Sequence, residues 1–235
     1  MPSDTQLKLH LGCGSVRPQG WVNIDASWNA RLAQTRGLRT VARFARILPK
    51  EQFEVSWSSG VTIHDVRKNF SYSNDSVEVV YASHLLEHLY QSDAIQLLSE
   101  VKRVLIPDGI VRFVVPDLRA IALGYFGQGP FVENKDPWNE EEAADEFCSR
   151  LLFGPASPPR GSLIHRLYSA AKDFHSHKWM YDAKSLIRHM RNAGFVDVQE
   201  KQYLESSISD IADVERAKKV LNGEGVCVEG RKAAQ

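Results

Sequence analysis

The 235-residue sequence has no excess of charge of either sign, because 29 lysine and arginine residues balance 29 aspartate and glutamate residues. This balance excludes a general long-range attraction to nucleic acid or to anionic lipid. Cysteine is scarce: Cys13, Cys148 and Cys227 lie far apart in the sequence and are odd in number. They match neither a disulfide framework nor a zinc-ribbon spacing, which suits a reducing compartment.

Long apolar runs are also missing. No stretch approaches the roughly 20 residues of a membrane span, and residues 1–6 lack the apolar run of a secretory signal. We therefore expect a cytoplasmic protein without a transmembrane segment. No Asn/Asp-Pro-Pro-Tyr motif follows the fourth predicted strand, so no nucleic-acid partner is expected.

What is present is an alternation of short apolar runs with helical patterns. The runs typical of strands are residues 7–11, 21–25, 61–63, 77–81, 110–115, 195–198 and 226–229. Ser92 is predicted to cap a helix that ends in a turn at residues 107–109. Asp182 is predicted to cap a second helix, which ends before Gly194. Residues 209–221 are predicted to form a third helix.

This order predicts the fold class α/β: a Rossmann-like sandwich with a mostly parallel sheet, formed by a single domain over residues 1–235. The pattern loosens at residues 119–178, which we interpret as an inserted helical and loop lid; a solvated helix between loops is the alternative. Arginines at helical spacing in residues 36–48 indicate an amphipathic helix on the core. Peripheral membrane contact or an anionic acceptor is its less favoured interpretation.

The cofactor is indicated by the residues that end the first strands. Gly12 and Gly14 follow the first strand and Asp25 ends the second, where ligands of such sheets bind. A dinucleotide needs a helix after the glycines to hold its diphosphate, and a ribose-binding acid about 20 residues further on. Here Asp25 comes much sooner, and Pro18 and Gly20 leave little room for a helix. NAD and FAD are therefore disfavoured.

S-adenosylmethionine (SAM) has no phosphate and fits this pattern better. It needs close backbone approach, a carboxylate for the ribose hydroxyls and a polar group near the adenine. Gly12 and Gly14 meet the first need, Asp25 meets the second, and Asp65, which follows the third strand, meets the last.

Several motifs in this order resemble the class I SAM-dependent methyltransferases, in particular the small bacterial type 11 group. They are KLHLGCG at residues 8–14, GWVNID at 20–25, SHLLEHL at 83–89, EVKRVLIPDG at 100–109, VVPDL at 114–118 and AGF at 193–195. The resemblance implies methyl transfer from SAM, with S-adenosylhomocysteine as the product. By elimination, the expected acceptor is a small molecule.

The strand ends and the resemblance together indicate the cofactor-binding residues. These are His10, Gly12, Cys13, Gly14, Asp25, Asp65, Val66, Ser83 and His84. Two departures from the family concern the methionine end of SAM. Many class I enzymes have an acid where His10 stands and a third glycine where Val16 stands. A SAM-binding protein without transferase activity is therefore the alternative function.

The candidate catalytic residues are His84, His88 and Asp117. His84 ranks first because a histidine titrates near neutrality and can take a proton from an acceptor hydroxyl or amine. For His88, a hydrogen bond within its own helix is the interpretation we favour over catalysis. Positioning the nucleophile in line supplies much of the rate in any case.

Residues 84–88 also match H-x-x-E-H, the signature of the inverted zinc peptidases. On a helix, His84 and His88 would share a face and bind zinc, with Glu87 as general base. The segment directly follows a buried strand and no downstream helical ligand is evident, so a zinc hydrolase is disfavoured. His175 and His177 are interpreted as pocket or surface residues, and no metal site is predicted.

Overall fold

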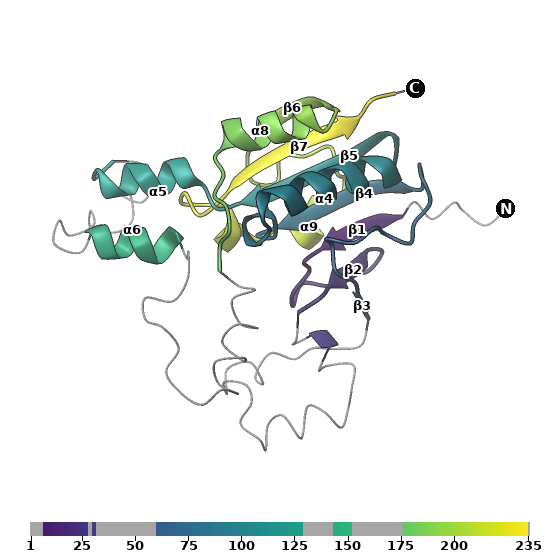
Figure 1. Ribbon diagram of the computed structural model, residues 1–235, viewed down its shortest axis with the longest axis horizontal. Coiled ribbons are helices and arrows are strands. Elements are labelled where there is room, and N and C mark those ends of the chain that lie inside the picture. The colour runs from purple at the N-terminus through teal and green to yellow at the C-terminus, as the bar shows by residue number, and fades with distance from the viewer. Residues whose placement is uncertain (1–6, 28–29, 32–59, 129–142, 152–175, 235) are drawn as a thin grey trace, which may run out of the picture.

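The seven predicted strands form one sheet in the order β3-β2-β1-β4-β5-β7-β6 (Figure 1). The computed structural model describes residues 7–27, 30–31, 60–128, 143–151 and 176–234. The strands are β1 Lys8–Leu11, β2 Val22–Asp25, β3 Val61–Ile63, β4 Val77–Ser83, β5 Leu105–Val115, β6 Phe195–Lys201 and β7 Val226–Lys232. The first five are parallel, whereas β7 runs antiparallel to both of its neighbours. The predicted mostly parallel α/β sheet is confirmed.

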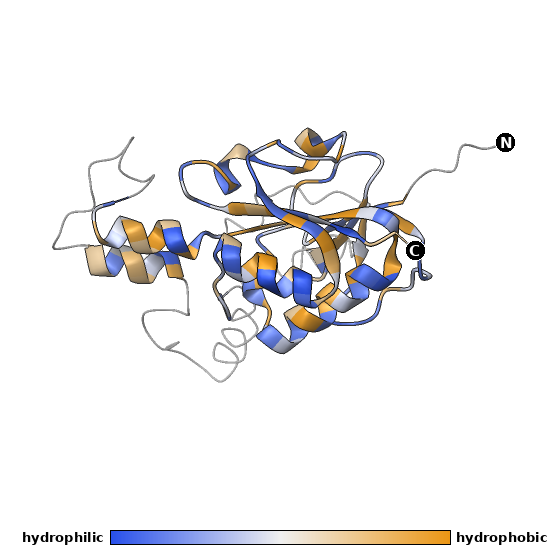
Figure 2. Ribbon diagram, turned by 90° about the horizontal axis from the view of Figure 1, so that it is seen from above, coloured by the Kyte–Doolittle hydropathy of each residue, from blue (hydrophilic) through white to orange (hydrophobic). Residues whose placement is uncertain are grey.

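Helices cover both faces of this sheet (Figure 2). On one face, α4 (Gln91–Val104) and α8 (Ala183–Asn192) bury their apolar side chains in the main core. On the other face, α9 (Ile211–Val214) and η4 (Ala217–Lys219) close a smaller core around Trp21 and Tyr81. Among the described residues, no helix has the length and apolar character that a membrane crossing requires.

A pair of helices stands beside the sheet rather than on it. The helices α5 (Leu118–Tyr125) and α6 (Ala143–Leu151) pack on each other through a small apolar cluster around Ile121 and Met180 (Figures 1 and 2). Both belong to the predicted insertion at residues 119–178, of which residues 129–142 and 152–175 lie outside the described part. The predicted basic helix at residues 36–48 lies outside it as well.

Three local predictions need correction. The helix α4 begins at Gln91 with Tyr90 as its N-cap, so Ser92 lies inside the first turn. Residues 107–109 do not end a helix in a free turn; they form a bulge within β5, because Val77 pairs with Leu105 and Val79 with Ile110. The predicted helix at residues 209–221 is broken into α9 and η4.

The break between α9 and η4 has a physical cause. Glu215 follows α9 with an extended backbone, and its buried carboxylate binds the buried guanidinium of Arg112 at 2.8 and 3.0 Å. A continuous helix would carry Glu215 away from this partner. By contrast, the predicted cap at Asp182 is confirmed, with a capping box to Ser185.

Candidate active site

The strand order reverses between β1 and β4, which is where ligands of open α/β sheets bind. Gly12 and Gly14 follow β1 with φ values of 63° and 53°, a conformation that favours glycine. A Cβ added to Gly12 would lie 3.2 Å from Cδ1 of Leu85, just beyond the end of β4. A Cβ on Gly14 would meet nothing within 4 Å. Gly12 therefore lets the loop after β1 approach the segment after β4, whereas Gly14 borders open space.

Asp25, at the end of β2, fixes the glycine loop. One carboxylate oxygen accepts a hydrogen bond from the backbone N–H of Gly14 at 3.0 Å, and the other accepts from Ser27 at 2.7 Å. The carboxylate thereby joins the first two strand ends. This is the geometry expected of an acid that faces the ribose of a nucleoside cofactor.

Cys13 shapes the loop from within. Its buried side chain packs against Ala30 and Val61, its N–H donates to the carbonyl of Ile24 at 3.1 Å, and its carbonyl accepts from Val16 at 2.9 Å. Burial raises the pKa of its thiol to about 12. Cys13 is therefore a structural member of the loop, with a thiol that stays protonated.

Asp65 and Val66 follow β3. Asp65 pairs with Arg67, whose guanidinium donates to both carboxylate oxygens at 2.7 and 2.9 Å and holds the pKa of Asp65 below its usual range. Val66 is buried in the main core, which leaves its backbone for a ligand. Ser83 ends β4 and is half-buried. These positions surround the switch point as predicted; their contacts to SAM stay predictions.

His10 lies inside the smaller core rather than at the surface of the site. Its ring contacts Tyr81 and Trp21, with ring centroids 5.4 and 6.4 Å apart, and its buried Nδ1 has no hydrogen-bond partner among the described residues. Burial lowers the pKa of His10 from 6.5 to about 4. The ring is therefore neutral at physiological pH, unlike the acid that many relatives carry here.

This shift makes the stability of the fold depend on pH. Between pH 6.5 and 4 the unfolded chain binds a proton at His10 that the folded chain does not. The free energy of unfolding should fall by about 1.4 kcal/mol per pH unit from this group as the pH drops through that window. We expect His10→Phe to remove this contribution. Measured by urea denaturation, the free energy of unfolding of the variant should fall between pH 7 and pH 5 by about 2 kcal/mol less than that of the wild type. An unchanged decrease would contradict the assignment.

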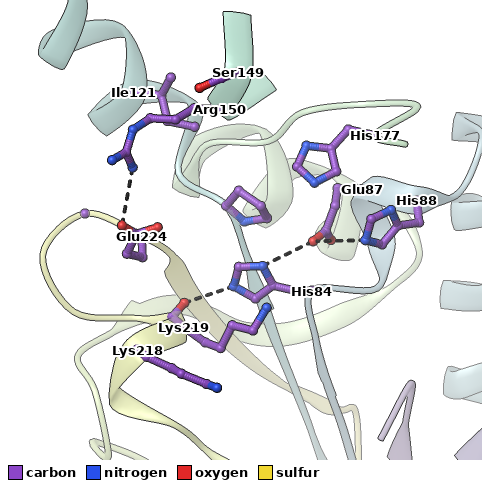
Figure 3. A pocket seen from close by; sticks show the side chains of 12 residues that line it. His84, Glu87, His88, Ile121, Ser149, Arg150, His177, Lys218, Lys219 and Glu224 are labelled. Atoms are coloured by element: carbon purple, nitrogen blue, oxygen red, sulfur yellow. Dashed lines mark hydrogen bonds and ion pairs between the residues drawn. The ribbon is translucent and has the colours of Figure 1, made fainter. Parts of the chain in front are cut away.

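Beyond the end of β4 lies a pocket of about 570 Å³ (Figure 3). Its described lining residues are His84, Glu87, His88, Pro116, Ile121, Ser149, Arg150, His177, Lys218, Lys219, Gly223 and Glu224. They come from the end of β4 and η1 (Leu86–His88), from the residues after β5, from the α5–α6 pair, and from the segments before α8 and before β7. Segments far apart in the sequence therefore converge on one cavity beside the glycine loop.

His84 enters this pocket with a φ of 52°, an uncommon conformation for a residue other than glycine. Its ring Nε2 donates to the carbonyl of Lys219 at 3.0 Å, so Nδ1 carries the lone pair and lies 3.4 Å from Oε1 of Glu87. Burial lowers the pKa of His84 to about 4. Both ring nitrogens thus face protein groups, which fits a positioning role better than that of a strong base.

This backbone also excludes the inverted-peptidase arrangement. His84 stands before the short helix η1, which begins at Leu86, so His84 and His88 do not share the face of one helix. The motif match is therefore not accompanied by the geometry that a zinc peptidase requires.

His88 and Asp117 have clear structural contacts. The Nδ1 of His88 donates to the carbonyl of Ser176 at 3.4 Å, outside its own helix. Asp117 caps α5 by accepting from the N–H of Arg119 at 2.9 Å, and burial raises the pKa of its carboxyl. Asp117 does not line the pocket as described, so capping is the role that the structure shows for it.

Glu87 is the residue of this pocket that sequence reasoning undervalued. Its side chain is fully buried, its two oxygens accept no hydrogen bond from any described residue, and burial raises its pKa to about 8. The sequence signal was the H-x-x-E-H match, which gave Glu87 a role only in the peptidase alternative. Lys219 and Arg150 had no signal, because their segments reach the pocket only through the tertiary fold.

Comparison with known families identifies the domain. Residues 9–113, which contain the glycine loop and the end of β4, match the family model described as methyltransferase domain. The chain therefore carries a methyltransferase domain at residues 9–113. This match agrees with the predicted methyltransferase family. A search of the curated proteins found no match.

Solved structures agree with the fold. A SAM-dependent methyltransferase from Archaeoglobus fulgidus is 14% identical, with a TM-score of 0.50 over 97% of this chain and 86% of that one. A possible exported protein from Bordetella parapertussis is 15% identical, with a TM-score of 0.45 over 98% and 62%. Human N-acetylserotonin methyltransferase in complex with SAM is 13% identical, with a TM-score of 0.45 over 100% and 50%.

The methyltransferase therefore spans less than two thirds of two of these three chains. At 14% identity, the structure from Archaeoglobus fulgidus supports the shared fold alone. The substrate must be inferred from the pocket.

Proposed function

We propose that the methyltransferase places SAM across the ends of β1 and β4 and methylates a small molecule held in the adjoining pocket. The observation that carries this proposal is the contact between the two regions: Gly12 approaches Leu85, and Leu85 directly follows His84 in the pocket wall. With the ribose at Asp25, the rest of SAM would lie next to the pocket that His84 lines. The acceptor then needs only to be held in line with the methyl group of SAM.

The charge of the pocket favours an acceptor with an anionic group. Lys218 and Lys219 line one wall, whereas the charge of Arg150 is balanced by Glu224 at 3.3 Å. A volume of about 570 Å³ is within the range of small-molecule sites.

The α5–α6 pair supports the predicted substrate-binding insertion. Ile121 comes from α5, and Ser149 and Arg150 come from α6, and all three line the pocket (Figure 3). The ion pair between Arg150 and Glu224 joins this pair to the segment before β7. We propose that the insertion forms the acceptor side of the site.

Titration calorimetry with SAM and with S-adenosylhomocysteine tests the cofactor site. The wild-type protein should bind both, and Asp25→Asn should bind each about ten- to hundredfold more weakly, because the ribose hydroxyls lose a charge-assisted hydrogen bond of about 1.5–3 kcal/mol. The asparagine keeps one oxygen for the glycine loop, so the fold should persist.

Asp213→Asn is the matched control, because it removes the same charge from an exposed position on α9. Its affinity for SAM should equal that of the wild type. Equal affinities in wild type and Asp25→Asn, with both proteins folded by circular dichroism, would exclude the proposed ribose contact.

A further inference from the structure

Three potential metal ligands converge at the inner end of the pocket. A carboxylate oxygen of Glu87 and one ring nitrogen each from His88 and His177 all lie within 4.8 Å of one another (Figure 3). The rings of the two histidines have their centroids 5.1 Å apart. Tetrahedral ligands that lie about 2.0–2.1 Å from zinc are roughly 3.3–3.4 Å from one another, so side-chain rotations that shorten the longest separation by about 1.5 Å would complete a site.

The carboxylate of Glu87 is the first sign that this cluster binds a cation. The side chain is 0% exposed, and neither oxygen accepts a hydrogen bond from a described residue. Nδ1 of His84 lies 3.4 Å and Nε2 of His88 lies 3.9 Å from Oε1 of Glu87. A buried acid without hydrogen bonds is costly, and a bound cation would remove that cost.

The two histidines are oriented as ligands. His88 donates its Nδ1–H to the carbonyl of Ser176, which directs the lone pair of Nε2 toward Glu87. His177 is 6% exposed and hydrogen-bonds the backbone of Leu151, while its buried Nδ1 has no partner in the described chain. Metal-bound histidines usually donate their second nitrogen to a carbonyl or carboxylate in this way.

The backbone holds the three residues together although their segments are distant in sequence. The carbonyl of Glu87 accepts from the N–H groups of Lys178 and Trp179, at 2.6 and 3.2 Å. These bonds hold the segment that carries His177 against η1. The arrangement is therefore built by the fold rather than by chance contact of surface side chains.

We propose that Glu87, His88 and His177 bind a divalent transition-metal ion of the zinc type, with an open coordination position toward the acceptor. Two imidazoles and one carboxylate suit zinc and its first-row neighbours, whereas calcium and magnesium prefer oxygen ligands. Three protein ligands leave a position for an exchangeable group, as in catalytic zinc sites.

The role of the ion rests on the proposed function. An acceptor hydroxyl at the open position loses its proton to solvent more readily, because the ion lowers its pKa. The oxygen then forms a bond to the methyl carbon of SAM. The carbon–sulfur bond breaks with its electron pair retained on sulfur, which gives S-adenosylhomocysteine. The acceptor class is thus a small molecule with a hydroxyl group.

Titration of the metal-stripped full chain with ZnCl₂ tests the site without SAM or acceptor. We expect one equivalent of zinc to bind, and Glu87→Gln and His177→Ala each to weaken binding by at least about a hundredfold, since even the loss of a supporting partner costs ten- to hundredfold. Cobalt substitution should give the intense visible absorption of a four- or five-coordinate ion with histidine ligands.

Two variants serve as controls. His64→Gln removes a histidine outside the pocket and should bind zinc as the wild type does. Lys219→Met removes the cation that faces Glu87 and should bind zinc equally well or more tightly. Weaker binding in Lys219→Met would show that this lysine supports the cluster rather than repelling a bound cation, and would overturn the proposal.

Other outcomes are equally decisive. Binding that survives both Glu87→Gln and His177→Ala, or no binding by folded wild-type protein, overturns the metal site. Magnesium competing with zinc at equal concentration would overturn the assigned metal class. Wild-type protein that binds zinc but not SAM would contradict the proposed function and leave the metal site standing. Failure of the metal site and failure of the proposed function are therefore distinguishable.

Discussion

Replacing Arg112 with methionine should lower the free energy of unfolding by about 3–5 kcal/mol, because it leaves buried carboxylates without their cation. Arg112 is fully buried on β5. Its guanidinium binds Glu215 at 2.8 and 3.0 Å and Glu229 at 3.4 Å, and it donates to the carbonyls of Gln202 and Glu205. Urea denaturation at neutral pH measures the loss.

Two further variants separate this effect from that of a lost surface charge. Lys201→Met removes a cation that pairs with the exposed Glu205 at 3.1 Å, and it should cost no more than about 1 kcal/mol. Adding Glu215→Leu and Glu229→Gln to Arg112→Met removes all three buried charges and should restore part of the stability, while the glutamine keeps an oxygen for the hydrogen bonds from Ser206 and Ser207. A loss below about 1 kcal/mol in Arg112→Met would refute the cluster's role.

The same arginine shows why part of the fold was not predictable. Residues 110–115 read as an apolar run, and the strand is where the sequence places it. Nothing local indicates that Arg112 points into a core, because its carboxylate partners follow 103 and 117 positions later. The helix expected at residues 209–221 fails for this reason: the tertiary partner of Glu215 outweighs local helix propensity.

Features set by neighbouring residues were predictable. Short apolar runs indicated the strands, the Asp182–Ser185 capping box indicated a helix start, and the glycines with Asp25 indicated a loop that the structure joins by a hydrogen bond. The acceptor side of the site was not predictable, because segments that are distant in the sequence assemble it. His177 could not be linked to Glu87 in the sequence, since the link is a pair of backbone hydrogen bonds 91 and 92 residues apart.

The glycine loop supplies the second large effect, on cofactor affinity. We expect Gly12→Val to weaken SAM binding roughly hundredfold. A valine at a φ of 63° is strained by about 1–3 kcal/mol, and its Cβ would lie 3.2 Å from Leu85. Either strain shifts the loop away from the carboxylate of Asp25, which we propose binds the ribose, and about 2.7 kcal/mol corresponds to a hundredfold in affinity. Titration calorimetry with S-adenosylhomocysteine measures the change.

Gly20→Val is the matched control, because Gly20 has a φ of 80° and nothing within 4 Å of an added Cβ. It carries a similar backbone strain away from the β1 end, so it should lower stability while keeping SAM affinity within about threefold. Wild-type affinity in Gly12→Val would refute the loop's assigned role. Adding Leu85→Ala to Gly12→Val relieves the side-chain contact alone. Full recovery of affinity in that double variant would show that the approach of β1 to the pocket segment, rather than the backbone conformation of Gly12, sets the cofactor site.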